Sequence, residues 1–251
     1  MNKKITIDLD ALEETYLLNF RSHKRDVLDF AQSSWNLSAL FLSSLKKIEK
    51  LTPKQKVDIY MLGKSMRLLR TISKLVTRGY WPEGEILFRA LFETQVLLSY
   101  ILRDDTDKRA EAWLNRTRPK ERWPMSEMLK EIGKSFGITY TNLSLYPHSH
   151  IISVINYIEL HENGMFSVSQ GPLGGDDNNI KAAQVLGSAA MTNASLCELA
   201  TPYFTLPTAW QESHLELMGL PYFQQQIPMV KEFVSKEENI QLVNQFLNRK
   251  N

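Results

Sequence analysis

Cysteine is almost absent from this sequence. Cys197 is the only cysteine among 251 residues, so no disulfide can form within the chain. No group of Cys and His residues has the spacing of a structural zinc site, and we expect neither a metal nor a cofactor. A chain without internal disulfides is typical of a reducing compartment, so the sequence predicts a cytoplasmic protein.

Long apolar runs are absent too. The most apolar segment is LFRALFETQVLLSYIL, residues 87–102, and Arg89 and Glu93 interrupt it. No run approaches the roughly 20 apolar residues that a helix needs to cross a bilayer. The N-terminal segment MNKKITIDLDALEE reaches acidic residues before an apolar stretch of secretory length can form. We therefore expect a soluble protein without a membrane partner.

Charge of one sign is also scarce. The 30 basic and 28 acidic residues leave a formal net charge of +2. This excess is too small for strong nonspecific binding to DNA, so any contact with nucleic acid must be local. The apolar content of 43% is enough for a sizeable buried core in one large domain or two small ones.

Helical periodicity dominates the rest of the chain. Apolar residues recur every three or four positions, and Thr52, Pro53 and Gln55 form the signature of a capping box with proline at the first helical position. In the tail, Pro207, Pro221 and Pro228 are expected to separate shorter helices, the last of them at 237–246. The helices expected before the tail cover 9–50 with a break near 23–26, 53–78 before Gly79, 82–101, a stretch capped by Asp105 or Thr106 that ends at 116, one from 124 to Gly137, and 177–204.

Residues 151–170 change period. Val154, Tyr157 and Ile158 favour strand, ENG is a turn signal, and MFSVS supplies a returning strand, although a helix over 151–161 fits as well. We predict an all-α fold, a helical bundle with a small β-hairpin insertion near 151–170. The bundle covers residues 1–205. A helical tail, 206–251, carries aromatic residues that favour packing on the bundle over a dimer face.

A polar stripe crosses the otherwise apolar helix expected at 82–101. Glu85, Arg89 and Glu93 recur every four residues and therefore share one face. One interpretation is a ladder of ion pairs within the helix on a narrow strip that faces solvent. The other is a charged pocket between helices, because polar groups that converge in apolar surroundings are candidates for a binding site.

The segment TNLSLYPHSH, residues 141–150, is the second candidate region. Tyr140, Ser144, His148 and His150 are expected to line a rim there. Pro147 favours an extended backbone, so the two imidazoles diverge and are not expected to bind one metal together. A histidine in this setting is either a helix cap or core residue, or a functional group that holds a ligand or moves a proton.

The signatures of several enzyme classes are missing. The segment GPLGGDDNN lacks the Lys-Ser/Thr ending of a phosphate-binding loop. HExxH, the Glu-x-x-His pattern of di-iron bundles and the GxSxG elbow of hydrolases are also absent. The function therefore depends on the polar stripe and the histidine segment.

The order of these blocks resembles an uncharacterised bacterial all-helical family. ILFRALFETQVLLSYIL, a Trp-containing helix and YTNLSLYPHSH match that family's Arg-x-x-x-Glu helix and its Tyr-x-x-Leu-Ser-x-x-x-His segment, over about residues 55–205. The family in turn looks like the HEPN helical bundles of phage-defence and toxin–antitoxin systems, some of which are metal-independent ribonucleases. The matching positions here are Arg89, Glu93, Tyr140, Leu143, Ser144 and His148.

The resemblance implies two functions that use the same residues. In a ribonuclease, Arg89 would stabilise charge on the phosphoryl group and His148 would move a proton, with Glu93 beside them. The hallmark of those ribonucleases, an Arg followed four to six residues later by His, is absent from this sequence. We therefore favour a noncatalytic or regulatory module that binds a small anionic ligand or a partner protein, and keep RNA and a homodimer as alternative partners.

Overall fold

The computed structural model describes residues 8–45, 50–116, 123–133, 158–160, 166–168, 172 and 175–235, with backbone only in the strands and after residue 228. The chain begins with two helices, α1 (Leu9–His23) and α2 (Arg25–Ser44). Asp8 starts α1 by accepting a hydrogen bond from the Ala11 amide at 3.1 Å. Lys24 separates the two helices, so the break predicted near 23–26 is confirmed.

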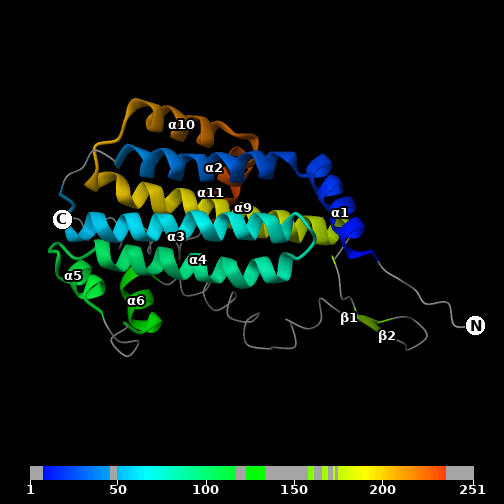
Figure 1. Cartoon of the computed structure of the whole chain (residues 1–251), viewed down its shortest axis with the longest axis horizontal. Coiled ribbons are helices and arrows are strands. Elements are labelled where there is room, and N and C mark those ends of the chain that lie inside the picture. The colour runs from blue at the N-terminus through cyan, green and yellow to red at the C-terminus, as the bar shows by residue number, and fades with distance from the viewer. Residues whose placement is uncertain are drawn as a thin grey trace, which may run out of the picture.

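The helices α3 (Pro53–Val76) and α4 (Trp81–Leu102) form an antiparallel pair along the middle of the molecule (Figure 1). The predicted capping box is present: the Thr52 hydroxyl accepts from the Gln55 amide, and the Gln55 side chain accepts from the Thr52 amide. Gly79 adopts a φ of 90° in the turn between the two helices, a conformation that favours glycine. The start of α3 is thus as predicted, whereas the helix ends at Val76, two residues before the predicted end at Arg78.

Two short helices follow, α5 (Lys108–Leu114) and α6 (Met125–Ile132). Thr106 accepts a hydrogen bond from the Lys108 amide at 3.3 Å, although α5 starts later than predicted. Two hydrogen bonds from the Arg109 guanidinium to the Glu131 carboxylate, at 2.6 and 3.0 Å, join α5 to α6. The helix predicted to end at Gly137 ends at Gly133, whose φ of 135° disfavours any residue with a side chain.

The strands β1 (Ile158–Leu160) and β2 (Phe166–Val168) pair antiparallel, with Glu159 opposite Ser167. Most of the residues around them lie outside the described part. The strands do not establish the hairpin insertion predicted for 151–170, which stays a prediction. The remaining described residues are overwhelmingly helical, and the all-α class is confirmed.

The C-terminal part consists of α9 (Asp176–Ala200), the 3-10 turn η3 (Thr201–Tyr203), α10 (Thr208–Gly219) and α11 (Pro221–Ser235). Pro207 precedes α10 and Pro221 opens α11, as expected. Pro228 lies inside α11, so the prediction that it separates two helices is wrong. The helix predicted at 237–246 lies outside the described residues.

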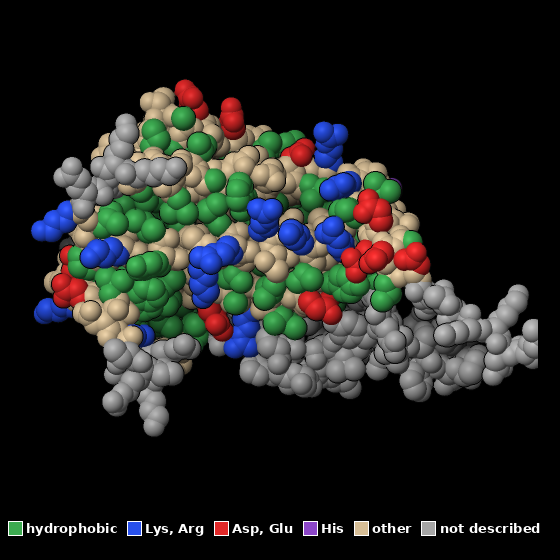
Figure 2. Space-filling model, viewed as in Figure 1, with side chains coloured by type: hydrophobic (Ala, Val, Ile, Leu, Met, Phe, Trp, Pro, Cys, Tyr) green, Lys and Arg blue, Asp and Glu red, His purple; other side chains and the backbone are tan. Residues whose placement is uncertain are grey.

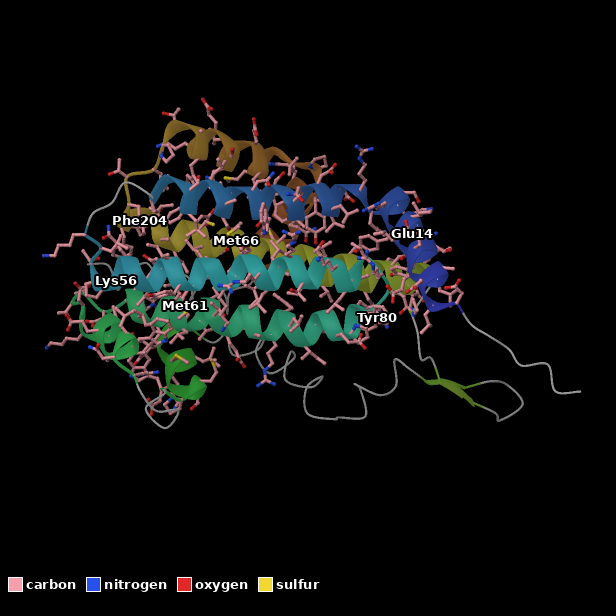
Figure 3. All side chains as sticks on the ribbon, viewed as in Figure 1. Glu14, Lys56, Met61, Met66, Tyr80 and Phe204 are labelled. Carbon is pink, nitrogen blue, oxygen red and sulfur yellow. The ribbon has the colours of Figure 1, made fainter. Side chains whose placement is uncertain are left out.

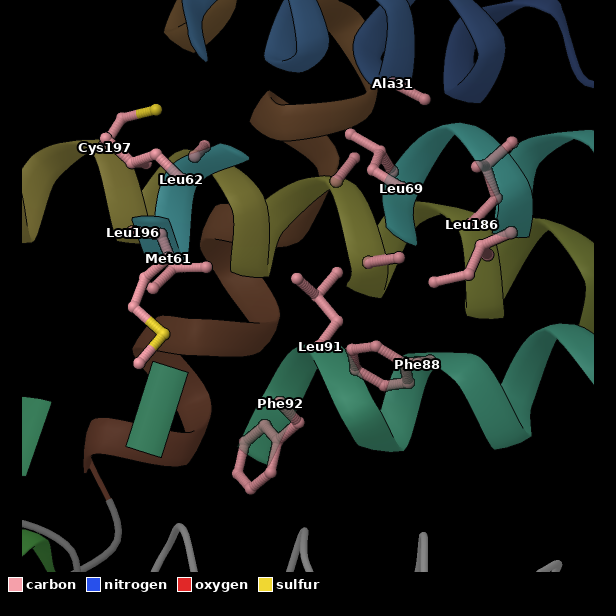
Figure 4. Packing of buried hydrophobic residues seen from close by; sticks show 14 of the residues in the cluster. Ala31, Met61, Leu62, Leu69, Phe88, Leu91, Phe92, Leu186, Leu196 and Cys197 are labelled. Atoms are coloured by element: carbon pink, nitrogen blue, oxygen red, sulfur yellow. The ribbon is translucent and has the colours of Figure 1, made fainter. Parts of the chain in front are cut away.

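The core forms where α9 packs against α2, α3 and α4. Figure 4 shows Leu62 and Leu69 of α3, Leu91 of α4, and Leu186 and Leu196 of α9 in this layer. All five are at most 2% exposed. Gly187 of α9 leaves room for the Tyr222 side chain of α11, because a Cβ added there would overlap the Tyr222 hydroxyl oxygen. No helix among the described residues has the length and apolarity to cross a membrane.

A polar network joins three helices inside this core. Asn193 of α9 donates hydrogen bonds from Nδ2 to the hydroxyls of Ser34 and Ser38 on α2, at 3.0 and 2.9 Å. Its Oδ1 accepts from the Ser65 hydroxyl of α3. Ser38 Oγ also lies 3.0 Å from Cys197 Sγ. These side chains are all fully buried, so their polar groups depend on one another for hydrogen bonds.

The described part of the tail packs on α2. Trp210 of α10 is 5% exposed and lies edge-on to Phe41, with ring centroids 6.5 Å apart. The ring centroids of Tyr222 in α11 and Phe30 in α2 are 5.2 Å apart. Figure 1 shows α10 running alongside α2 on the outside of the bundle. The aromatic residues of the tail thus complete the core on this side.

Candidate functional site

The predicted polar stripe is only partly a surface feature. Arg89 Nε donates to Glu93 Oε1 at 3.0 Å, which is the pair that the ladder interpretation requires. The Arg89 side chain is 14% exposed and that of Glu93 is 36% exposed. Glu85, one turn before Arg89, is half-buried. The arginine is thus more buried than a strip facing solvent would leave it, which keeps the pocket interpretation open.

The other residues of the predicted site lie outside the described part of the chain. They are Tyr140, Ser144, His148 and His150. The meeting of Arg89 with His148 in one recess therefore stays a prediction.

A basic face that the predictions missed runs along α3. Lys64, Arg67 and Lys74 are exposed there, and Arg78 follows one turn after Lys74. The acidic residue in this stretch, Asp58, points into the bundle and is fully buried. Figure 2 shows the result as a band of Lys and Arg side chains across the middle of the molecule, where α3 lies in Figure 1. Asp and Glu side chains gather instead at the end near α1.

A groove opens beside this face, between α3 and α4. Lys64, Arg67, Leu68 and Thr71 of α3 and Leu87 of α4 line it, and its volume is about 380 Å³. The half-buried Leu68 and Leu87 give it an apolar floor, while the exposed Lys64 and Arg67 place two positive charges at the rim. Arg67 Nε also donates to the Gly63 carbonyl at 3.3 Å, which draws the guanidinium back along its own helix. The arrangement suits a ligand with an anionic group.

The groove and the Arg89–Glu93 pair are on different sides of α4. Successive residues in an α-helix are rotated by about 100°, so Leu87 and Arg89 point in nearly opposite directions. Phe92 and Val96, which share the side of Arg89, are buried. The protein therefore has two separate cationic places on this pair of helices, and the sequence pattern indicated the less exposed of the two.

A third polar feature is buried at the end of the bundle where α3 begins. Both carboxylate oxygens of Asp58 lack a hydrogen-bond partner among the described residues. Burial raises the pKa of Asp58 to about 8, and the Lys54 ammonium one turn away lowers it in part. Lys54 is 8% exposed, donates to the Asp104 carbonyl at 2.5 Å and lies over the Tyr203 ring. A buried carboxyl with this pKa makes the stability of the fold depend on pH.

Nucleophile and metal chemistry find little support in the described part of the chain. Burial raises the pKa of the Cys197 thiol to about 12, so this cysteine is a core residue and not a thiolate nucleophile. The described residues contain no group of three His, Cys, Asp or Glu side chains placed to hold a metal ion. His214 pairs with Glu198 at 2.8 Å and stacks on Trp210, which is a structural role.

The basic face of α3 had a signal in the sequence. Lys64, Arg67, Lys74 and Arg78 follow steps of three, seven and four, which place them on one side of a helix. The capping box had already located that helix. The net charge of the whole chain hid the local excess, and the groove itself needed the packing of α4 against α3.

A family model described as a family of unknown function, DUF5677, matches residues 55–123, which cover most of α3 and all of α4 and α5. No curated protein and no solved structure matches. The matched range includes Arg89 and Glu93 but ends before Tyr140 and His148, so it is shorter than the 55–205 expected from the resemblance. Over residues 55–123 the chain is thus similar to an uncharacterised family, as its Arg-x-x-x-Glu helix indicated.

Proposed function

We propose that this protein is a noncatalytic binding module that recognises an anionic ligand in the groove between α3 and α4. The observation that carries the proposal is the pair of cationic side chains, Lys64 and Arg67, at the rim of a groove with an apolar floor. No carboxylate of α3 competes for the ligand, because Asp58 is buried. An anion at the rim gains two attractive charges without displacing an exposed acidic side chain from α3.

The groove is a better candidate than the Arg89 pocket in the described residues. The Arg89 guanidinium donates to Glu93 at 3.0 Å, so its charge is already balanced by a carboxylate. An anion at Arg89 would have to compete with Glu93 for the guanidinium. The Arg89, Glu93 and His148 pocket, with Glu85, Tyr140, Ser144 and His150 around it, is therefore the second place that the experiment must test.

The proposal is tested with inorganic pyrophosphate as the probe. Thermal unfolding and isothermal titration calorimetry at low ionic strength measure binding to the wild type, to Arg67→Ala and to Arg89→Ala. We expect pyrophosphate to raise the Tm of the wild type and of Arg89→Ala, since a ligand at 100 times its Kd adds about 2.7 kcal/mol to stability. We expect Arg67→Ala to lose most of this shift. Arg25→Ala is the matched control, because Arg25 is 84% exposed on α2.

Three results would overturn the groove. If Arg89→Ala abolishes the shift and Arg67→Ala keeps it, the ligand binds in the pocket predicted from the sequence. If all variants respond as Arg25→Ala does, the shift comes from nonspecific screening. If pyrophosphate neither raises the Tm of the wild type nor gives a calorimetric signal at low salt, the proposal of a small anionic ligand is wrong.

The HEPN-like alternative is a metal-independent ribonuclease of a phage-defence or toxin–antitoxin system. It requires Arg89 and His148 to act on one phosphate, and it draws support from the resemblance alone. Incubation of the purified protein with total RNA tests it directly. Cleavage that survives EDTA and is lost in His148→Ala would replace the binding module with an enzyme.

A further inference from the structure

The exposed face of α3 carries more cations than the groove uses. Lys56, Lys64, Arg67 and Lys74 lie on one side of the helix, and Arg78 follows just after its end at Val76; we call these five residues the α3 stripe. At 100° per residue the four helical residues fall within an arc of about 80°, and a rise of 1.5 Å per residue puts about 27 Å between Lys56 and Lys74. Figure 3 shows Lys56 near the start of α3 and Tyr80 beyond its end, so the stripe extends over nearly the whole helix.

The charge of the chain is segregated onto this helix. Residues 53–78 contain seven basic residues and one acidic residue, Asp58, and Asp58 is buried. The rest of the chain contains 23 basic and 27 acidic residues. The net charge of +2 therefore describes neither part, because a basic helix lies on an otherwise acidic molecule. A linear set of like charges creates a potential that a polyanion can follow.

Few carboxylates balance this charge in the described part of the chain. Arg78 pairs with Glu13 at 3.6 Å and marks the end of the stripe near α1. Lys56, Arg67 and Lys74 have no ion pair with a described carboxylate. Arg70, also exposed, flanks the stripe on the side away from the groove. Lys56, Arg67 and Lys74 can thus contact phosphates without first breaking an ion pair to a described carboxylate.

An exposed aromatic ring interrupts the cations. Tyr60 lies between Lys56 and Lys64 on the same face and is 61% exposed. Its ring is 6.3 Å from that of Trp113 on α5, at an angle of 44°. Because Tyr60 stays 61% exposed beside Trp113, a planar group can reach its ring. Aromatic rings beside a basic track are typical of surfaces that bind single-stranded nucleic acids, because the bases stack on them.

We infer that the α3 stripe binds a single-stranded nucleic acid, with phosphates on Lys56, Arg67 and Lys74 and a base stacked on Tyr60. This inference goes beyond the proposed function. It shares Lys64 and Arg67 with the groove, but rests on Lys56, Tyr60 and Lys74, which lie outside the groove. Recognition is independent of sequence, since the contacts are phosphates and the face of a base.

The test is fluorescence anisotropy with labelled 20-nucleotide oligo(dT) and oligo(rU) at several salt concentrations. The stripe variant combines Lys56→Glu and Lys74→Glu. Its control combines Arg21→Glu and Arg25→Glu, which make the same change in net charge at exposed positions of α1 and α2. We expect the stripe variant to bind at least tenfold more weakly than the control. Its slope of log K against log salt should fall by about 1.4, the contribution of two single-strand phosphates.

Tyr60→Ala separates a nucleic acid from other polyanions. Loss of one stacked base should weaken oligonucleotide binding by about fivefold or more. Binding of heparin and poly-glutamate, which have charge but no bases, should be unchanged. Equal losses for heparin and oligonucleotides in Tyr60→Ala would overturn the nucleic-acid assignment in favour of a general polyanion or acidic protein. Equal losses in the stripe and control variants, or no binding by the wild type at 50 mM salt, would overturn the stripe itself.

The two proposals fail in different ways. The stripe variant should keep the pyrophosphate shift of the wild type, because Lys64 and Arg67 are unchanged. Pyrophosphate binding without oligonucleotide binding would leave the groove and remove this inference. Oligonucleotide binding without pyrophosphate binding would leave the stripe and remove the groove as a site for small ligands.

Discussion

At the scale of single residues, Asp58 is the least expected side chain in the protein. It is fully buried, and its two oxygens lack hydrogen-bond partners among the described residues. A buried ionised carboxylate without partners costs several kcal/mol, so the folded protein keeps the group protonated at neutral pH. Lys54 offsets part of this cost from one turn away. Stability should therefore depend on pH through this residue.

The sign of that dependence follows from the two states. The unfolded carboxyl ionises near its ordinary pKa of 3.8, whereas the folded one keeps its proton until about pH 8. The unfolded chain releases a proton that the folded chain retains, so the free energy of unfolding falls as pH rises between these values. The Asp58→Asn side chain cannot ionise, so the free energy of unfolding of this variant should change less with pH over this range. We expect its free energy of unfolding, measured with urea at pH 8.5, to exceed that of the wild type by about 2 kcal/mol or more.

The control for Asp58→Asn is Asp105→Asn, since Asp105 is exposed. Its unfolding profile should follow that of the wild type at every pH. If Asp58→Asn shows the same fall with pH as the wild type, the carboxyl is hydrated or ionised in the folded protein.

Asn193 is the second residue on which the core depends. It is fully buried, and its side-chain amide connects α9 to the other two helices: the NH2 donates to hydroxyls of α2 and the carbonyl accepts from a hydroxyl of α3. Asn193→Ala would remove these hydrogen bonds, leave three serine hydroxyls short of a partner and open a cavity. We expect a loss of about 3 kcal/mol in the free energy of unfolding. Chemical denaturation measures it, with the exposed Asn115→Ala expected to cost less than about 0.5 kcal/mol.

At the scale of elements, the close packing of α4 on α3 depends on a glycine. A Cβ added to Gly84 of α4 would lie 2.5 Å from Val76 Cγ2 at the end of α3. Gly63, in the middle of α3, has no atom within 4 Å of that position. The same substitution should therefore have opposite effects on two neighbouring helices.

We expect Gly84→Ala to destabilise the protein by about 1–3 kcal/mol, because a side chain there separates the two helices. Gly63→Ala should stabilise it by about 0.5–1 kcal/mol, since alanine loses less backbone entropy in a helix. Urea unfolding of both variants measures the difference. A destabilising Gly63→Ala would mean that the middle of α3 is more crowded than its surroundings indicate.

The sequence was most informative about where single helices begin and end. The capping box at Thr52 and the positive φ of Gly79 bound α3, and both signals depend on neighbouring residues alone. The errors arose where a local signal allows more than one outcome. Pro228 lies inside a helix instead of ending it, and α6 ends at Gly133 and not at Gly137, because either glycine fits a stop and only the packed structure selects one.

At the scale of the whole molecule, the tail and the bundle share a core. Trp210 is 5% exposed against Phe41 of α2, and Tyr222 lies against Phe30. The boundary predicted near residue 205 therefore separates two helical elements that share one hydrophobic core. Unfolding of residues 206–235 should then be coupled to unfolding of the bundle.

We expect Trp210→Ala to lower the free energy of unfolding of the whole protein by about 3 kcal/mol, since it removes a large buried side chain. Hydrogen exchange followed by mass spectrometry should show faster exchange in peptides of α3 and α4 as well as in α10. Leu215→Ala, at a position of α10 that is 69% exposed, is the control and should change little. Faster exchange confined to 206–235 would show that the tail unfolds separately.

Several features were determined by the sequence alone: the all-α class, the start of α3, the break at Lys24 and the i, i+4 pairing of Arg89 with Glu93. Each depends on residues within a turn or two of one another, and local periodicity records them. The groove beside Lys64, the burial of Asp58 and the Tyr60–Trp113 pair were decided only by the tertiary structure. They depend on which helices pack together, and that choice rests on contacts between residues far apart in the chain.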